Sequence, residues 1–309
     1  MDKMKAFVRA EAENNRVELM DIHIPTIDDN EVLVKVQAFG VGIHDRYFIP
    51  QNAAFPYTIG TEATGVIVKI GEQVKNCQIG DRVILSSSMQ LKGGCWAEYV
   101  AVSSDKTIHM VDEMDFATGA ALPVAGKTAL ESMHALNLKK GDSLFVAGAS
   151  GAIGTLIIQL ATNEGIHVIG SASRKNQAYM KSLGAKEAVD YSDPNWKTQV
   201  KIWTPGGVDA ALAIQPGTGA DSVDVVKSGG KVITVSGDKV EPERDITVGQ
   251  FQHQLNMQKA IGELIQDIIA DKVKIVIERI YPFEEAIKAL EKTETRHARG
   301  KLVVSVKSE

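Results

Sequence analysis

The feature that most constrains the fold is a regular alternation of strand-like and helix-like segments between residues 143 and 236. The strand-like segments are short apolar runs: LFVAGA (144–149), HVIGSAS (167–173), EAVDY (187–191), VDAALAI (208–214) and KVITVS (231–236). Segments with helical spacing separate them, one of which runs through Trp196 and Trp203. Strands that alternate with helices at this spacing are joined by right-handed crossovers into a parallel, doubly wound sheet. The sequence therefore predicts an α/β chain with a Rossmann-type, doubly wound parallel sheet.

The first third of the chain follows a different pattern, rich in β-branched residues and without intervening helices. Its strand-like segments span residues 31–40, 64–71, 81–87 and 95–102. This pattern predicts an antiparallel sheet or partial barrel. The last strand-like segments, KIVIERI (274–280) and KLVVSV (301–306), are similar to it. We therefore expect one domain formed by residues 1–115 and 255–309 and a second formed by residues 116–254.

A glycine-rich turn, VAGASGAIG (146–154), connects the first strand of the alternating region to the helix that follows. Gly148, Gly151 and Gly154 are spaced three apart, as GxxGxxG, which is less specific than the GxGxxG of common dinucleotide-binding sites. Glycine permits positive φ and close approach of a pyrophosphate, and the helix N-terminus offers free N–H groups. The turn predicts phosphate contacts from Gly148, Ala149, Ser150, Gly151, Ala152 and Ile153. The alternative is a tight turn that binds no ligand.

The end of the second strand decides the choice of cofactor. Sites that prefer NAD usually have Asp or Glu there to bind the ribose hydroxyls. Here the strand ends at Ser173 and is followed by Arg174 and Lys175, so a hydroxyl and two cations are available for a 2′-phosphate. This predicts NADPH as the cofactor, with Tyr191 at the end of the next strand as a further phosphate contact. The alternative is that both cations are ordinary solvated residues at a helix start.

Composition excludes several classes of function. The net charge is −5, with no long run of like charges, which argues against a general nucleic-acid-binding protein. The sequence contains no apolar run of about 18 residues, the length that would predict a membrane span. Its first residues do not have the pattern of a secretory signal. Only Cys77 and Cys95 are present, without a CxxC pair, which favours a reducing compartment. We expect a cytoplasmic protein without membrane association.

Several segments, taken together and in order, resemble a known family along nearly the whole chain. They are PYTIGTEATGVIVKIG (56–71), IGDRVI (79–84), GGCWAEYV (93–100), LPVAGKTALESM (122–133), VAGASGAIG (146–154), SLGAKEAVDY (182–191) and ARGKLVVSV (298–306). The chain resembles the medium-chain dehydrogenase/reductase superfamily, in particular its zinc-independent quinone oxidoreductase-like branch. The resemblance implies an N-terminal GroES-like catalytic domain, rejoined by the C-terminus, and an active site between the domains.

The resemblance also bears on metal binding. The zinc-dependent branch has a Cys in its first active-site loop and a GHE motif. Here the loop FGVGIHDRYF (39–48) has no Cys, and the GHE position reads Gly60-Thr61-Glu62. His44 near Glu62 could form a partial site, but zinc needs three or four converging ligands. We therefore expect no metal site.

Further site residues follow from the resemblance or from the end of a predicted strand. Thr128 matches a threonine that contacts the nicotinamide end of the cofactor, although a hydroxyl near a helix start also often bonds its own backbone. Val235, Ser236 and Gly237 follow the fifth strand, at the edge where such sheets bind ligands. Tyr47 matches a loop tyrosine of the quinone reductases and is the candidate catalytic residue, whose phenol would hydrogen-bond the carbonyl oxygen of the acceptor. The alternative is that Tyr47 is an aromatic residue that only packs.

Without zinc there is no Lewis acid to polarise an alcohol, so we expect hydride transfer from NADPH to a quinone or an α,β-unsaturated carbonyl compound. The alternatives are an enoyl-thioester reductase and a non-catalytic NADPH-binding protein with a regulatory or structural role. We expect substrate specificity to come from residues 47–57 and from the surroundings of Phe251. The segment RYFIPQNAAFPY (46–57) is aromatic and apolar, which predicts a flat hydrophobic acceptor. The resemblance also implies association into a homodimer or homotetramer through the last strand of the nucleotide-binding sheet, near residues 246–252. An unpaired sheet edge is a physical reason for such pairing.

Overall fold

The computed structural model describes residues 2–250 and 255–306, and the chain divides into two compact units. The first unit contains residues 1–124, 257–262 and 277–309, and the second contains residues 125–256 and 263–276. Helices α2 and α7 each contribute residues to both units. The expected domain limits at residues 115/116 and 254/255 remain a prediction.

The first unit consists mainly of short strands. They are β1 (Lys3–Arg9), β2 (Val17–His23), β3 (Glu31–Val41), β4 (Tyr57–Thr58), β5 (Glu62–Ile70), β6 (Arg82–Ser86), β7 (Tyr99–Ser103), β8 (Thr107–His109), β15 (Ile277–Pro282) and β16 (Lys301–Ser305). Helical segments are α1 (Phe116–Ala120), α8 (Ala286–Glu294), and the 3₁₀ turns η1 (Ser104–Lys106) and η3 (Phe283–Glu285).

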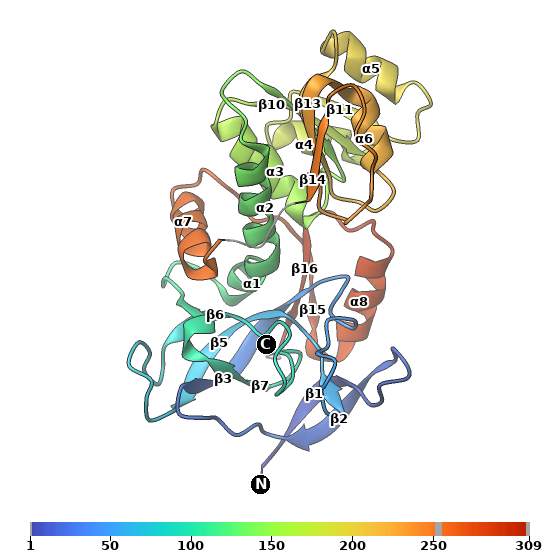
Figure 1. The fold of residues 1–309 in the computed structure, drawn as a ribbon. Helices are drawn as coiled ribbons and strands as arrows, with labels where there is room; N and C mark the ends of the chain where they lie inside the picture. The colour runs from blue at the N-terminus through green and yellow to red at the C-terminus, as the bar shows by residue number, and fades with distance from the viewer. Residues whose placement is uncertain (1, 251–254, 307–309) are drawn as a thin grey trace. The chain divides into compact units, whose positions relative to one another are not determined.

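Two sheets organise this unit, and antiparallel pairing predominates, as predicted. The larger has the order β15-β16-β3-β5-β6-β8, with β7 also paired to β3, and the smaller has the order β2-β1-β4. Strand β16 pairs antiparallel with β3, so strands from the two ends of the chain, red and blue in Figure 1, are neighbours in one sheet. The last strand therefore returns to the first sheet, as its composition suggested.

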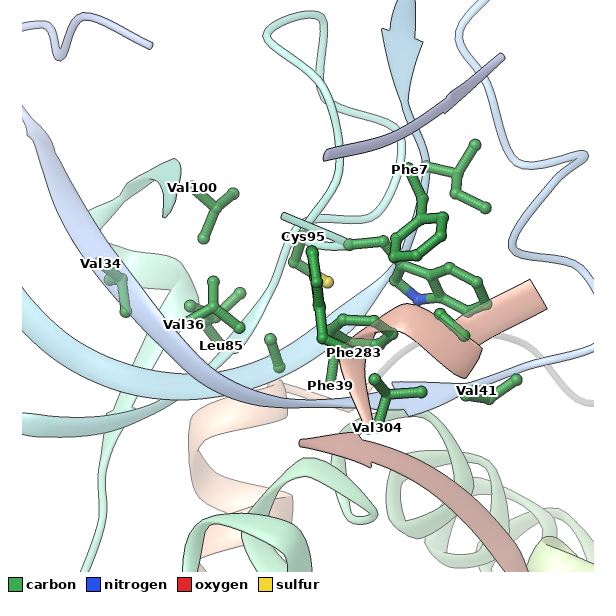
Figure 2. Packing of buried hydrophobic residues seen from close by; sticks show 14 of the residues in the cluster. Phe7, Val34, Val36, Phe39, Val41, Leu85, Cys95, Val100, Phe283 and Val304 are labelled. Atoms are coloured by element: carbon green, nitrogen blue, oxygen red, sulfur yellow. The ribbon is translucent and has the colours of Figure 1, made fainter. Parts of the chain in front are cut away.

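Aromatic packing fills the space inside the first unit. Figure 2 shows Phe7, Phe39 and Phe283 in the same cluster as several buried valines. Trp96 is fully buried and stacks on Phe39, with ring centroids 4.9 Å apart. Burial of a large side chain of this kind stabilises a fold by about 1.5–3 kcal/mol. The segment around Trp96 was predicted as strand from residue 95, but β7 begins only at Tyr99.

The second unit contains the parallel sheet. Its strands are β9 (Ser143–Ala147), β10 (His167–Ala172), β11 (Glu187–Asp190), β12 (Val208–Ala213), β13 (Val226–Thr234) and β14 (Thr247–Gln250). Its helical segments are α2 (Pro123–Leu136), α3 (Ala152–Asn163), η2 (Arg174–Asn176), α4 (Gln177–Ser182), α5 (Trp196–Trp203), α6 (Gly219–Val225) and α7 (Met257–Ile269).

This sheet has the order β11-β10-β9-β12-β13-β14, with every pair parallel. The order is that of a Rossmann fold, in which the direction of strand addition reverses between β9 and β12. Strand β9 is almost entirely buried, as expected for a parallel strand covered on both faces. Helix α3 packs on β10, and α6 packs on β12 and β13 (Figure 1). The predicted α/β fold class is confirmed.

No helix within residues 2–250 and 255–306 combines the length and apolar character needed to cross a membrane.

Candidate functional site

The turn between β9 and α3 requires its three glycines for different reasons. Gly148 has a φ of 91°, a conformation that favours glycine. A Cβ at Gly154 would lie 2.5 Å from the Gly148 carbonyl oxygen, so the helix could not pack this closely on the turn. Gly151 has an ordinary φ of −81°, and a Cβ there would meet its nearest neighbour only at 3.6 Å. No protein atom therefore lies close to the Cβ position of Gly151, and a phosphate that approached this turn would need that space.

The backbone N–H groups of this turn differ in whether the protein itself supplies their acceptor. Those of Gly148 and Ala149 both donate to the Ser171 carbonyl at 3.1 Å, which holds the turn against β10. The N–H groups of Ala152 and Ile153, the first two residues of α3, have no acceptor within the helix, whereas the Thr155 N–H donates to the Gly151 carbonyl. Gly151 is the N-cap and provides no side chain to cap them. This end of α3 therefore combines free donors with the positive end of the helix dipole.

The predicted cations follow β10 directly. Ser173 has an extended backbone and precedes the 3₁₀ turn η2, in which Arg174 and Lys175 are exposed. The Arg174 side chain is 82% exposed, and its Nε lies 3.7 Å from Oδ2 of Asp190. A side chain this exposed can change its orientation easily, so the contact does not exclude a phosphate partner.

Asp190 was not predicted as a site residue, yet it ends β11 beside the end of β10. It is in register with Ala172, and its carboxylate accepts the Ser192 hydroxyl at 2.7 Å and the Ser192 N–H at 3.0 Å. These hydrogen bonds hold the pKa of Asp190 below its usual value. Its position immediately before Tyr191, which is exposed, is the sequence signal that could have identified it.

Asn176 was also not predicted. It is buried at the end of η2, and its side-chain amide donates to Oγ of Ser150 and to Oγ of Ser173. The sequence contains no strong signal for these hydrogen bonds, because Asn176 and Ser150 are 26 residues apart.

The remaining nucleotide-site candidates lie at two places. Val235, Ser236 and Gly237 follow β13, where the Val235 N–H donates to the Ala213 carbonyl and Gly237 has a φ of 78°. Thr128 is buried within α2, and its carbonyl accepts the Ser132 hydroxyl. The carboxyl edge of the parallel sheet thus contains the glycine-rich turn and the ends of β10, β11 and β13. Thr128 instead lies on helix α2.

The loop after β3, in the first unit, contains Tyr47. Its backbone turns on hydrogen bonds from the N–H groups of Tyr47 and Phe48 to the His44 carbonyl. Tyr47 is 51% exposed, and the rings of His44 and Phe48 are nearly parallel with centroids 5.1 Å apart. Partial burial, with a smaller effect of the Arg296 charge, lowers the pKa of His44. The loop therefore presents aromatic surface and one phenol hydroxyl.

The carboxylate of Asp45 links this loop to the neighbouring segment through two hydrogen bonds. Its Oδ2 accepts the Gly42 N–H at 2.6 Å, and its Oδ1 accepts the Thr61 hydroxyl at 2.8 Å. The side chain is buried, and burial raises its pKa to about 6, against the opposing effect of those hydrogen bonds and of Lys301. The loop is therefore fastened to the Gly60-Thr61-Glu62 segment by one carboxylate.

Glu62 is fully buried and has partners on both oxygens. Lys301 Nζ donates to Oε1, and the Val124 N–H donates to Oε2 at 2.7 Å. With Asp45 also occupied by internal donors, neither carboxylate is available as a ligand. Across residues 2–250 and 255–306, no three His, Cys, Asp or Glu side chains are grouped to hold a metal ion. The residues present do not fit a zinc ion.

Comparison with known proteins gives two matches to family models. Residues 28–112 match the model "Alcohol dehydrogenase GroES-like domain", and residues 183–304 match the model "Zinc-binding dehydrogenase". The second description refers to zinc, but the donor set described above does not support a metal site among the residues that the structure describes.

Individual relatives agree over nearly the whole length of the chain. It is 30% identical to a quinone oxidoreductase of Sus scrofa over 305 residues, covering 92% of each chain. It is 32% identical to a chloroplastic NADPH-dependent alkenal/one oxidoreductase of Arabidopsis thaliana, covering 92% of this chain and 74% of the relative. The structure of the quinone oxidoreductase from Coxiella burnetii superposes with a TM-score of 0.89 at 30% identity, covering 99% of this chain and 100% of that one.

Proposed function

Because the chain belongs to the medium-chain dehydrogenase/reductase superfamily, in its quinone oxidoreductase-like branch, we propose that it reduces quinones or α,β-unsaturated carbonyl compounds with NADPH. Relatives that align with 92% of the chain are named for these two acceptor classes. The fold is that of a pyridine-nucleotide-binding enzyme.

We propose NADPH rather than NADH as the reductant. The observation that supports this choice is the end of β10, where Ser173, Arg174 and Lys175 provide a hydroxyl and two exposed cations. Asp190 offsets part of the Arg174 charge, but no carboxylate follows β10 in the place that would repel a 2′-phosphate. The other proposed cofactor contacts are Thr128, Gly148, Ala149, Ser150, Gly151, Ala152, Ile153, Tyr191, Val235, Ser236 and Gly237.

The reaction that we propose needs no metal. This part of the proposal depends on the saturation of Asp45 and Glu62 by donors of the protein itself. The bound cofactor supplies the hydride, and the protein orients the reactants and excludes water. In this proposal the hydroxyl of Tyr47, a residue that is 51% exposed, donates a hydrogen bond to the acceptor oxygen on which negative charge develops.

The acceptor that this loop favours is flat and hydrophobic. Tyr47 and Phe48 are both about half exposed, and neighbouring exposed aromatic side chains often mark a surface that contacts a ligand or partner. The other aromatic residue predicted to contact the acceptor, Phe251, lies outside the described residues. The support for this acceptor class therefore comes from the loop after β3.

The test is oxidation of NADPH and NADH by the purified protein with a benzoquinone, a naphthoquinone, an enone and an enoyl-thioester. We expect turnover with a quinone or the enone, preference for NADPH, and no loss of rate on adding a chelator. Turnover with the enoyl-thioester alone would indicate the rival reductase. Tight NADPH binding without turnover of any acceptor would indicate a non-catalytic NADPH-binding protein.

Two further expectations remain predictions. Strand β14 ends the order of the parallel sheet, and an edge of this kind supports a homodimer or homotetramer. A cytoplasmic location stays an inference from the composition.

A further inference from the structure

Asn176 lies between two segments that the proposed function assigns to different phosphate groups. Ser150 belongs to the glycine-rich turn after β9, and Ser173 follows β10. Asn176 is the last residue of η2 and is only 6% exposed. Its backbone N–H donates to the Ser173 carbonyl at 2.8 Å, so the turn itself orients the side chain.

The side-chain amide of Asn176 joins these two serines. Its Nδ2 donates to Oγ of Ser150 at 3.1 Å and to Oγ of Ser173 at 3.3 Å. An amide nitrogen has two N–H donors, so each serine receives one. The two serines are partly exposed, whereas the asparagine between them is buried.

The direction of these hydrogen bonds has a chemical consequence. A serine hydroxyl has one hydrogen, and its oxygen accepts through lone pairs. Because each oxygen accepts from Asn176, the hydrogen of each hydroxyl is free to donate elsewhere. Phosphate oxygens are acceptors, and a hydrogen bond to a charged partner is stronger than one between neutral groups.

We propose that Asn176 is a positioning residue that sets the hydroxyls of Ser150 and Ser173 as donors toward the phosphates of the bound dinucleotide. The inference rests on the proposed use of a pyridine dinucleotide. Ser150 would donate to the pyrophosphate, which NADH and NADPH share, and Ser173 to the 2′-phosphate, which only NADPH has. Asn176 therefore supports binding of both cofactors and contributes to the preference for NADPH.

Two substitutions test the donor direction. Asn176→Asp keeps the shape but replaces the amide donors with a carboxylate, which would accept from both serines and repel phosphate. We expect it to weaken NADPH binding by about 100-fold and NADH binding by about tenfold, since each lost charge-assisted hydrogen bond corresponds to roughly tenfold or more. Asn176→Ala removes the donors without the charge, and we expect about tenfold weaker NADPH binding. Asn195→Asp makes the same chemical change at an exposed position, the N-cap of α5, and should leave both affinities unchanged.

A double-mutant cycle separates positioning from a general structural role. In the Ser150→Ala/Ser173→Ala background, Asn176→Ala should change NADPH affinity by less than about twofold, since the groups through which it acts are gone. An effect of the same size in both backgrounds would overturn the proposal.

Dissociation constants are measured by calorimetry without an acceptor, so this test is separate from catalysis. If the unaltered protein binds neither nucleotide, the proposed function itself fails. If it binds NADPH and Asn176→Asp binds it equally well, only the role of Asn176 is wrong.

Discussion

At the scale of single residues, the half-exposed phenol of Tyr47 allows a direct test of the reaction. Tyr47→Phe keeps the ring and removes the hydroxyl. We expect the rate of enone or quinone reduction to fall by about 100-fold, as is typical for loss of a proton donor or an oxyanion hydrogen bond. NADPH affinity should not change. An unaltered rate would show that Tyr47 only packs and that solvent supplies the proton.

Arg174 determines cofactor preference in our proposal. Arg174→Ala should reduce kcat/KM for NADPH by about 10- to 100-fold, the range expected for a hydrogen bond between charged groups. The value for NADH should stay nearly constant. Asp190→Asn provides the matched opposite change, because it removes the carboxylate beside Arg174. Asp190→Asn should strengthen NADPH binding by a few-fold at low salt. If Arg174→Ala lowered kcat/KM for NADPH less than kcat/KM for NADH, the assignment of Arg174 to the 2′-phosphate would be wrong.

Asp45 makes the stability of the protein depend on pH. Its pKa is about 6 in the folded state against a usual value of 3.8, so the folded state binds the proton more tightly than the unfolded state. Its contribution to stability is therefore greatest below about pH 4, decreases as the pH rises, and is lost above about pH 6. A shift of this size corresponds to about 3 kcal/mol.

Asp45→Asn removes this titration and is the variant to compare. We expect the difference in unfolding free energy, unaltered protein minus variant, to fall by about 2–3 kcal/mol between pH 4 and pH 7. Urea unfolding at several pH values measures it. A difference that is constant with pH would show that Asp45 titrates normally.

At the scale of elements, the strand–helix alternation predicted the parallel sheet well, and helix α5 spans Trp196–Trp203, the two residues through which a helix was expected. Strands β1 and β2 were not predicted. In β2 only Val17 is buried, so this strand lacks the apolar alternation that marks a half-buried strand. Strand β1 does alternate at its start, and its pairing with β2 and β4 is a long-range property that no local pattern reports.

Two glycines at the start of α3, Gly151 and Gly154, are expected to respond differently to substitution. Gly154→Ala would place a Cβ 2.5 Å from backbone atoms, so we expect a loss of about 1–3 kcal/mol in stability. Gly151→Ala meets nothing closer than 3.6 Å and has an ordinary φ, so the fold should tolerate it. The added methyl group would nevertheless occupy the place of the pyrophosphate, and NADPH binding should weaken by roughly tenfold or more.

Melting temperature and nucleotide affinity, measured together, distinguish these two roles. A Gly151→Ala protein that binds NADPH normally would show that the turn does not hold the phosphates.

At the scale of the whole molecule, Lys301 and Glu62 join parts of the chain that are 239 residues apart. Lys301→Met leaves the Glu62 carboxylate buried without its cation, which should destabilise the first unit by about 3–5 kcal/mol. Adding Glu62→Gln should restore part of this loss, because no uncompensated charge then remains buried. Unfolding free energies of the single and double variants check this, and equal losses in both would show that the ion pair itself contributes little.

The sequence by itself determined the fold class, the glycine-rich turn, the missing acid after the second strand and the family. Each depends on patterns that follow the order of residues along the chain and does not require knowing which distant segments meet. The tertiary structure alone decided which side chains meet. Asp45 with Thr61, Glu62 with Lys301, and Asn176 with Ser150 are pairs whose partners come from different strands and turns. Such contacts depend on strand register and on the packing of loops, and the free energy that selects them is distributed over the whole core.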